Sequence, residues 1–234
     1  MKKQIGFLLV MLVMLLTVSA AMADNVRKSG DFKYTVKGNG TATIVEYLGK
    51  KDDIILPNMV DGYTITTIGE SAFEYPGSGF ADASFSVTLP NTITSIEAFA
   101  FANRNLISIN IPDSVEYIGY GAFLGNNEIQ FRISNDHPCF ATIDGCLYNK
   151  KNKELLKAVQ TGGSIRIPTG ILSIGDYAFA NMSLDSLDYC YLPISLLKIG
   201  NYAFKNFDCF NGLEIPGSVC EIGSNAFEDA HLYH

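Results

Sequence analysis

The residues of this chain best suited to nucleophilic or metal chemistry are its three histidines and five cysteines. His137 lies two residues before Cys139, a combination that can provide a base and a nucleophile. Side chains two apart on an extended segment need not meet, however, and no third residue orients the base, so we interpret His137 as a loop histidine. His231 and His234 could bind a metal ion if the tail were helical, but chain ends are usually disordered.

Two other short motifs have a chemical and a structural interpretation. Asp52 and Asp53 are adjacent carboxylates, but they follow Lys50 and Lys51, which is typical of a solvated polar turn. The stretch Gly38-Asn39-Gly40 lacks the helix that a phosphate-binding loop needs, so it predicts a hairpin turn. We therefore predict a non-enzymatic protein without a cofactor or a metal ion.

The first residues have the pattern of a secretory signal peptide. Lys2 and Lys3 precede an apolar run from Ile5 to Leu16, and small residues follow as far as Ala23. The apolar run is too short to span a bilayer comfortably, so we predict a cleaved signal over residues 1–23, with an uncleaved anchor as the alternative. The expected location is secreted or at the cell surface, with the periplasm left open, and no membrane span is expected after cleavage.

The charge of the chain excludes some classes of partner. Loss of Lys2 and Lys3 with the signal lowers the formal net charge from −7 to −9. An acidic chain lacks the electrostatic attraction that drives binding to nucleic acids and anionic membranes. We therefore expect neither a nucleic acid nor an anionic membrane as the partner.

An internal repeat runs through the rest of the chain and must position all of these residues. Each copy has a proline preceded by an aliphatic residue, and five copies have an Ala-Phe pair ten and eleven residues later. Isoleucine occupies position plus six of these five copies, and a branched aliphatic residue occupies position plus three. The prolines are Pro57, Pro90, Pro112, Pro168, Pro193 and Pro216. The pairs are Ala100-Phe101, Ala122-Phe123, Ala178-Phe179, Ala203-Phe204 and Ala226-Phe227.

The positions of the repeat predict one strand and one close-packed turn in each copy. Positions minus three and minus one are apolar and alternate with polar residues, which is typical of a half-buried strand that the proline then ends. Positions plus three and plus six should point back inward, and a glycine at plus seven should let the backbone bend before the Ala-Phe pair. One copy alone buries too little to be stable, so the copies must stack into a solenoid.

The repeat also suggests where the five cysteines lie. Cys190 occupies position minus three and Cys146 an aliphatic position of an irregular copy, so both are expected in the core. Cys220 shares its position with Leu197, whereas Cys139 and Cys209 are expected to be exposed. No C-x-x-C spacing supports zinc or thioredoxin-like chemistry, and the odd number leaves at least one thiol without an intramolecular partner. The disulfide pairing stays open.

Three segments depart from the regular copies. Residues 24–52 alternate on both sides of Gly38-Asn39-Gly40 and predict a β-hairpin cap over the first coil. Residues 131–160 predict a variant coil with a protruding hairpin inside a solenoid of about seven coils that spans 53–234. No cap is evident after Phe227, so we expect the short tail to cover the last coil, with contact to another subunit as the alternative.

The unit I/L-P-x-x-I/V-x-x-I-G-x-x-A-F resembles the BspA-like class of leucine-rich repeats of bacterial surface and secreted proteins. The opening stretch from Phe32 to Pro57 resembles the N-terminal cap of that family, and the stretch from His137 to Leu156 resembles its hairpin-bearing variant repeat. The resemblance implies an α/β solenoid, a right-handed superhelix with strands on its concave side and short helical turns elsewhere. It also implies adhesion to host matrix proteins or to other cells, and no catalysis.

The best candidate for a site is the exposed strand face, because position minus two lies between two inward residues. Stacked coils place these side chains in a ladder with a spacing of about 4.8 Å. Tyrosine and arginine are enriched at the energetic centres of protein interfaces, which draws attention to one end of the ladder. The alternative is an ordinary solvated sheet face. The candidate ligand-binding residues are Thr88, Asn110, Arg166, Tyr189, Tyr191 and Glu214.

Three functions follow from these observations. The first is an exported, non-enzymatic recognition or adhesion module that binds a host matrix or cell-surface protein through the exposed strand face. The second is a structural envelope protein that assembles by weak self-association through the C-terminal coil. The third is a glycan-binding module. The first is our prediction, and the second and third are its alternatives.

Overall fold

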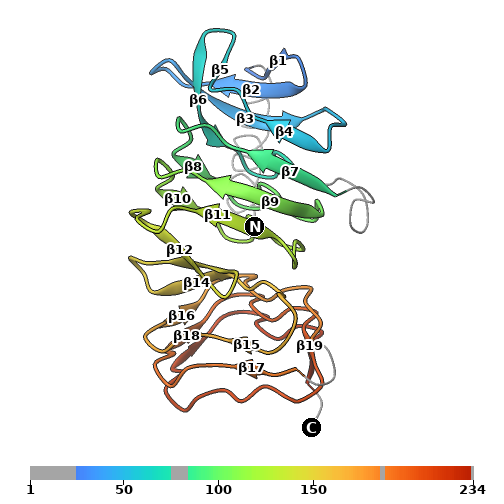
Figure 1. The fold of residues 1–234 in the computed structure, drawn as a ribbon, viewed down its shortest axis with the longest axis vertical. Helices are drawn as coiled ribbons and strands as arrows, with labels where there is room; N and C mark the ends of the chain where they lie inside the picture. The colour runs from blue at the N-terminus through green and yellow to red at the C-terminus, as the bar shows by residue number, and fades with distance from the viewer. Residues whose placement is uncertain (1–24, 75–83, 185–187, 233–234) are drawn as a thin grey trace, which may run out of the picture.

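The computed structural model describes residues 25–74, 84–184 and 188–232. The predicted signal peptide, residues 1–23, lies outside this described part. The chain forms a solenoid of about eight turns that stack along one axis (Figure 1). The expected short helical turns are hydrogen-bonded turns instead, and no helix in the described residues is long and apolar enough to cross a membrane.

Each regular coil except the last contributes one strand to each of two walls. The first wall holds the predicted strand before the proline, and the second wall holds a two-residue strand that ends at position plus six. The first wall consists of β4 (Asp53–Ile55), β7 (Phe85–Thr88), β9 (Leu106–Ile111), β11 (Gln130–Ile133), β15 (Ile165–Arg166) and β17 (Cys190–Tyr191). The second wall includes β6 (Tyr63–Ile68), β8 (Ser95–Ile96), β10 (Tyr117–Ile118), β16 (Ser173–Ile174), β18 (Lys198–Ile199) and β20 (Glu221–Ile222).

Strands of successive coils pair in parallel, as stacked repeats require. In the first wall, β4, β7, β9 and β11 form one sheet and β15 and β17 form a second. The second wall was not predicted, because its strands in the regular coils are only two residues long and cannot show an alternating pattern. It forms only when neighbouring coils supply hydrogen-bond partners, which no single copy reveals.

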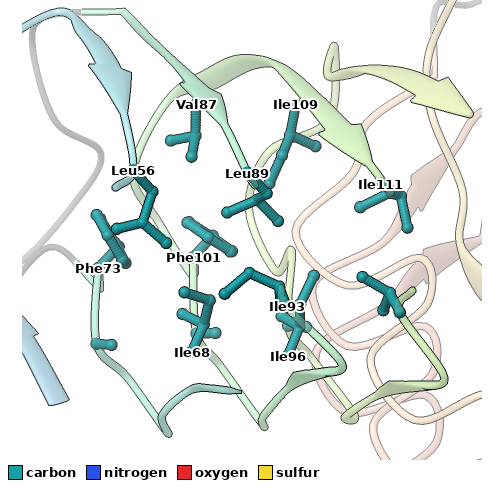
Figure 2. Close-up of a cluster of buried hydrophobic side chains, with 14 of the residues drawn as sticks. Leu56, Ile68, Phe73, Val87, Leu89, Ile93, Ile96, Phe101, Ile109 and Ile111 are labelled. Carbon is teal, nitrogen blue, oxygen red and sulfur yellow. The ribbon is translucent and has the colours of Figure 1, made fainter. Parts of the chain in front are cut away.

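The Ala-Phe pairs form a third wall of turns. Where two such coils are adjacent, the amide of the phenylalanine donates to the carbonyl of the alanine in the next coil, as from Phe101 to Ala122 at 2.9 Å and from Phe204 to Ala226 at 2.7 Å. The phenylalanine rings stack in the core, with centroids 5.8 Å apart for Phe101 and Phe123. Figure 2 shows how Phe101 and its aliphatic neighbours point into the same space.

The glycine at plus seven has a different role from the predicted bend. Gly119 does not have a positive φ, and its amide donates to the carbonyl of Ile96 at 2.8 Å. A Cβ on Gly119 would lie 2.5 Å from the backbone nitrogen of Ala98. Glycine is therefore needed because adjacent coils approach so closely that no side chain fits between them.

The N-terminal segment adds antiparallel strands to the edge of the second wall. β2 (Phe32–Val36) and β3 (Thr41–Tyr47) form a hairpin across Gly38-Asn39-Gly40, and β1 (Arg27–Ser29) pairs with β2. β3 then pairs in parallel with β6, so the hairpin continues the sheet of the coils. The short strand β5 (Met59–Val60) also pairs with β6.

A three-stranded meander divides the solenoid near its middle. It consists of β12 (Phe140–Ile143), β13 (Cys146–Asn149) and β14 (Glu154–Lys157), and β14 pairs with β16. Leu147 packs in the core of the N-terminal coils, whereas Cys146 and Tyr148 pack in the core of the C-terminal coils. The meander is therefore a partition between two cores, which explains why three successive residues of β13 are buried.

The last coil is open at the end of the solenoid. Ile222 is 53% exposed, although Ile199 at the same position of the preceding coil is fully buried. Residues 213–215 do not form the first-wall strand that the repeat predicts. After this coil, β21 (His231–Leu232) pairs with β19 (Asp208–Cys209) rather than covering the exposed isoleucine.

Candidate functional site

The predicted site residues fall into two groups. Thr88 and Asn110 lie on β7 and β9 in the N-terminal half, on the far side of the meander from the others. Asn110 is used to join coils: its side-chain oxygen accepts from the amide of Leu89 at 2.6 Å, and its side-chain nitrogen donates to the carbonyl of Leu89 at 2.9 Å. The side chain of Asn110 therefore joins two coils, and Thr88 lies next to it on β7.

Arg166, Tyr189 and Tyr191 form a continuous stack on the C-terminal half of the first wall. Arg166 and Tyr191 are directly opposite each other in the parallel pair β15 and β17, and the guanidinium lies 4.1 Å from the ring centroid. Tyr189, two residues before Tyr191 on the same face, stacks on it with centroids 5.6 Å apart and planes at 20°. Both tyrosines remain about 40% exposed.

The backbone beneath the stack is held firmly. The amides of Ile165 and Ile167 donate to the carbonyls of Tyr189 and Tyr191 at 2.8 and 3.0 Å. The Ser164 hydroxyl accepts from the amide of Tyr189 at 2.9 Å. The tyrosine rings thus project from a fixed platform, which lowers the conformational entropy lost when a partner covers them.

Glu214 lies beside the stack, across a cleft. The cleft has a volume of about 350 Å³, and Tyr191 and Glu214 both line it. Its remaining lining comes from the end of the first wall and from the last proline turn. The lining residues are Cys190, Tyr191, Leu192, Ile194, Glu214, Pro216, Gly217 and Ser218.

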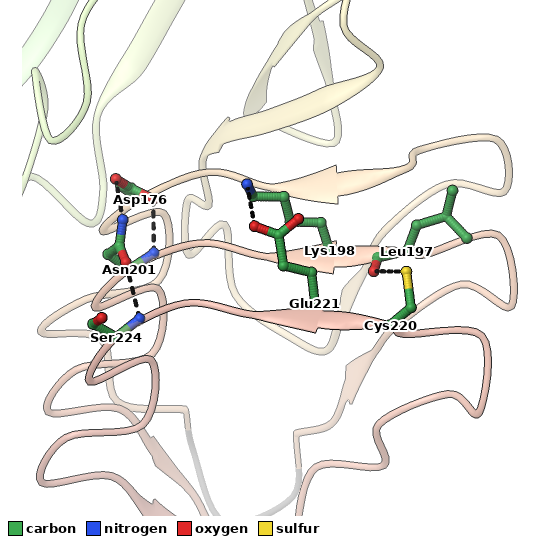
Figure 3. A network of polar contacts seen from close by, with 7 residues as sticks. All are labelled: Asp176, Leu197, Lys198, Asn201, Cys220, Glu221 and Ser224. Atoms are coloured by element: carbon green, nitrogen blue, oxygen red, sulfur yellow. Dashed lines mark hydrogen bonds and ion pairs between the residues drawn. The ribbon is translucent and has the colours of Figure 1, made fainter.

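Several charged side chains of the C-terminal coils form ion pairs or hydrogen bonds with the adjacent coil. Lys198 and Glu221, at one repeat position of adjacent coils, form an ion pair of 2.7 Å. Asp176 accepts from the amide of Asn201 at 2.7 Å, and Asn201 in turn accepts from the amide of Ser224 at 2.9 Å (Figure 3). Glu214, unlike Glu221, has no ion-pair partner among the described residues.

An aromatic row on another part of the surface was missed in the sequence. Phe99, Tyr177 and Tyr202 occupy position plus nine, directly before the Ala-Phe pair, and each has a positive φ between 54° and 61°. Tyr177 and Tyr202 stack with centroids 5.1 Å apart, and Tyr120 contacts Phe99 edge to face. The sequence signal was present, since three of these five positions hold an aromatic residue.

Cys139 and His137, the candidate nucleophile and base, have structural roles in the core rather than catalytic ones. His137 lies in a loop between β11 and β12, as predicted, and its side chain is fully buried. Its Nε2 lies 2.9 Å from the carbonyl oxygen of Pro112, to which it donates, and its Nδ1 accepts from the amides of Cys139 and Phe140 at 3.1 and 3.2 Å. Both ring nitrogens are therefore occupied by backbone groups, and neither is positioned to activate a thiol.

The cysteines are free thiols. Cys146 and Cys190 are buried as predicted, but the expectation that Cys139 and Cys209 are exposed is wrong, because both lie in the cores. Burial raises the pKa of the Cys146 and Cys190 thiols, which keeps them protonated and unreactive. Cys220 is exposed. Among the described residues, no three His, Cys, Asp or Glu side chains are grouped as metal ligands.

A buried lysine lies at the partition between the cores. Lys157 on β14 is only 2% exposed, and its Nζ donates to the side-chain oxygen of Asn127 at 2.8 Å. Asn127 in turn donates to the carbonyl of Asn181, which links the N-terminal coils to the C-terminal ones. Burial lowers the pKa of Lys157 from 10.5 to about 7.

Comparison with known proteins places this repeat in a family. A family model described as a BspA type leucine rich repeat region, with six copies, matches residues 52–154 and 153–234. The chain belongs to the BspA-type leucine-rich-repeat family. All six repeat prolines lie within the matched residues. No curated protein matches the chain.

Solved structures of leucine-rich-repeat proteins are similar to this family member. One is a leucine-rich cell-surface protein from Faecalibacterium prausnitzii, at 23% identity and a TM-score of 0.48, with 87% of this chain and 52% of that one covered. A leucine-rich-repeat protein from Bacteroides ovatus has 19% identity and a TM-score of 0.36, with 84% of this chain and 61% of that one covered. A leucine-rich-repeat protein from T. pallidum has 16% identity and a TM-score of 0.35, with 87% of this chain and 89% of that one covered. The chain spans about half the length of the F. prausnitzii protein.

Proposed function

We propose that this chain is an exported, non-enzymatic recognition module that binds a protein through the stack of Arg166, Tyr191 and Tyr189 beside Glu214. The observation that carries the proposal is the stack itself: three large side chains are held in contact on the surface, at 4.1 and 5.6 Å, without a role in joining coils through side-chain hydrogen bonds. Tyrosine and arginine on a fixed backbone are the residue types that dominate binding energy at protein interfaces.

The arrangement of the rings favours a protein over a glycan. A sugar ring stacks on an open aromatic face, but Tyr191 has the guanidinium of Arg166 near one part of its ring and Tyr189 stacked against it. The free parts are ring edges and hydroxyl groups, which suit hydrogen bonds and apolar contacts to a polypeptide. Membership of a family of surface repeat proteins supports an extracellular partner, such as a matrix or cell-surface protein.

The test is a binding assay with a panel of purified extracellular matrix proteins and cell-surface ectodomains on a biosensor. We expect Tyr189→Ala and Arg166→Ala to weaken binding by about tenfold or more, with an unchanged melting temperature. Tyr117→Ala is the matched control, because Tyr117 is equally exposed but lies on the second wall. Binding that survives both changes, or that falls as much in the control, contradicts the proposal.

Self-association is a second candidate, favoured by the exposure of Ile222 at the open end. A second copy that stacks on this coil would bury an isoleucine whose counterparts in the described coils are all buried. We expect analytical ultracentrifugation to detect dimers that Ile222→Lys abolishes. Ile55→Lys, at an exposed isoleucine near the opposite end, should leave them unchanged. A strict monomer over a wide concentration range contradicts this candidate.

A further inference from the structure

Among the described residues, β17 forms no backbone hydrogen bonds with the segment 212–215 of the last coil. In the preceding interval, the amides of Ile165 and Ile167 donate to the carbonyls of Tyr189 and Tyr191. Cys190 and Leu192 occupy the same repeat positions one coil later, so their amides face the last coil in the same way. Among the described residues, no backbone hydrogen bond joins them to residues 212–215. β17 therefore has one paired edge and one free edge.

The free edge faces a cleft of suitable size. The cleft of about 350 Å³ separates β17 from the segment of Glu214, Pro216 and Gly217, and its volume falls within the range of ligand pockets. Apolar side chains line it: Ile194 is 83% exposed, and Leu192 and Pro216 lie beside it. Unpaired strand donors beside an exposed apolar surface are the two features that strand addition uses.

We propose that this cleft binds an extended peptide segment of a partner protein, which adds as a strand along the free edge of β17. The carbonyl oxygens of the peptide accept from the amides of Cys190 and Leu192, and one apolar side chain of the peptide enters the cleft beside Leu192 and Pro216. A neighbouring lysine or arginine of the peptide pairs with Glu214. The inference deepens the proposed function, because it rests on protein recognition at this end of the first wall and names the form of the ligand.

The charge and chemistry of the cleft favour a peptide over other occupants. Backbone donors in register along a strand recognise the regular carbonyls of an extended chain, whatever its sequence. Glu214 then adds a preference for a basic residue, as does the net charge of −7 of the chain. A second copy of this chain is a competing occupant, and it is separated from a peptide by the experiment below.

Gly217 offers a way to block the cleft without disturbing the coil. It lines the cleft, its φ is not positive, and no atom lies within 4 Å of the position that a Cβ would take. Gly217→Phe should therefore fold normally and place a ring in the cleft. Gly38→Phe is the matched control, because Gly38 has the same open surroundings in the N-terminal hairpin.

The probe is a phage-displayed library of random dodecapeptides, selected against the chain without its predicted signal. Selected peptides should contain an apolar residue beside a basic one and should bind with micromolar affinity. Hydrogen exchange should slow at the amides of Cys190 and Leu192 when the peptide is present. Gly217→Phe should weaken binding by about tenfold or more, and Gly38→Phe should leave the affinity unchanged.

Three results overturn the inference: no peptide is selected, the two glycine variants bind the peptides equally, or exchange at Cys190 and Leu192 does not change. Ultracentrifugation of the free chain gives one more. If dimers form and Gly217→Phe dissociates them, a second copy occupies the cleft instead of a peptide. If Gly217→Phe loses peptide binding while Tyr189→Ala still binds matrix proteins, the cleft is a binding site and the tyrosine stack is not. If Tyr189→Ala loses binding to matrix proteins while Gly217→Phe still binds the peptides, only the cleft is rejected.

Discussion

The rings of Phe99 and Tyr177 meet edge to face, with centroids 5.3 Å apart, although their coils lie on opposite sides of the meander. Gly121 occupies the same repeat position in the coil between them, and a Cβ there would lie 2.5 Å from the ring of Phe99. The ring of Phe99 can therefore pass over Gly121 and reach the next half of the molecule. This contact, together with the Lys157–Asn127 pair, joins the two halves of the solenoid.

Gly121→Ala should destabilise the protein by about 1–3 kcal/mol, because φ at Gly121 is 59° and the added carbon displaces Phe99. Urea denaturation followed by circular dichroism measures the change in free energy of unfolding. Gly38→Ala is the control, with open space around it and no positive φ, and should change stability by less than about 0.5 kcal/mol. Equal midpoints for the two variants would contradict the prediction.

Lys157→Met should stabilise the protein, and the gain should depend on pH. Burial lowers the pKa of Lys157 in the folded state from 10.5 to about 7, so the unfolded chain binds a proton there that the folded chain does not. Above about pH 10.5 the amine is neutral in both states, so its burial does not lower the free energy of unfolding. As the pH drops from about 10.5 to about 7, only the unfolded chain gains the proton, so the free energy of unfolding falls and is lowest below about pH 7.

The gain from methionine should therefore grow from pH 10 to pH 7 and then level, reaching several kcal/mol less the cost of the lost hydrogen bond to Asn127. Urea denaturation at several pH values in this window measures it. Lys33→Met, at an exposed lysine of the hairpin, provides the control and should give a flat difference. A flat difference for Lys157→Met would show that its amine is not desolvated.

Ile199→Ala and Ile222→Ala form a matched pair at one repeat position. Ile199 is fully buried, so its truncation should lower the free energy of unfolding by about 2–4 kcal/mol. Ile222 is half exposed at the open end, and its truncation should cost less than about 1 kcal/mol. Thermal and urea unfolding both test the difference. Similar losses at the two positions would mean that the last coil is covered in solution.

His137→Ala should destabilise the variant coil by about 2–4 kcal/mol, because it leaves the carbonyl of Pro112 and two buried amides without their partner. His231→Ala, at an exposed histidine, should have a much smaller effect. Hydrogen exchange should show faster exchange at Cys139 and Phe140 in the first variant. Unchanged exchange there would refute the role of the imidazole as a bridge between coils.

The sequence predicted the solenoid, the first wall and the inward positions, because the repeat copies confirm one another. Position plus three is buried at Ile93 and Val115, and position minus one is buried at Leu89 and Ile111, as the alternating pattern requires. The family resemblance and the hairpin at Gly38-Asn39-Gly40 are confirmed as well. These features depend on residue type at a fixed spacing, which a single sequence contains.

Features that depend on contacts between coils were not predictable in the same way. The second wall, the close approach at Gly119 and the side-chain contact between Asn110 and Leu89 all arise from hydrogen bonds to a neighbouring copy. Cys139 and Cys209 were wrongly expected to be exposed, because burial in the irregular parts of the stack is set by neighbours that have no repeat pattern. Of the six candidate site residues, four are gathered at one end, whereas Thr88 and Asn110 lie apart.

The exposure of Ile222 predicts the order in which the coils unfold. Because each coil is stabilised mainly by its neighbours, the coil of the half-exposed Ile222 is the least stabilised of the described regular coils, and we expect it to open before the others. The meander, with its own core on either side, is a natural place for that process to pause. A pulling force on the C-terminal end would thus unfold the C-terminal coils first, while the coils between the meander and the N-terminal hairpin stay folded.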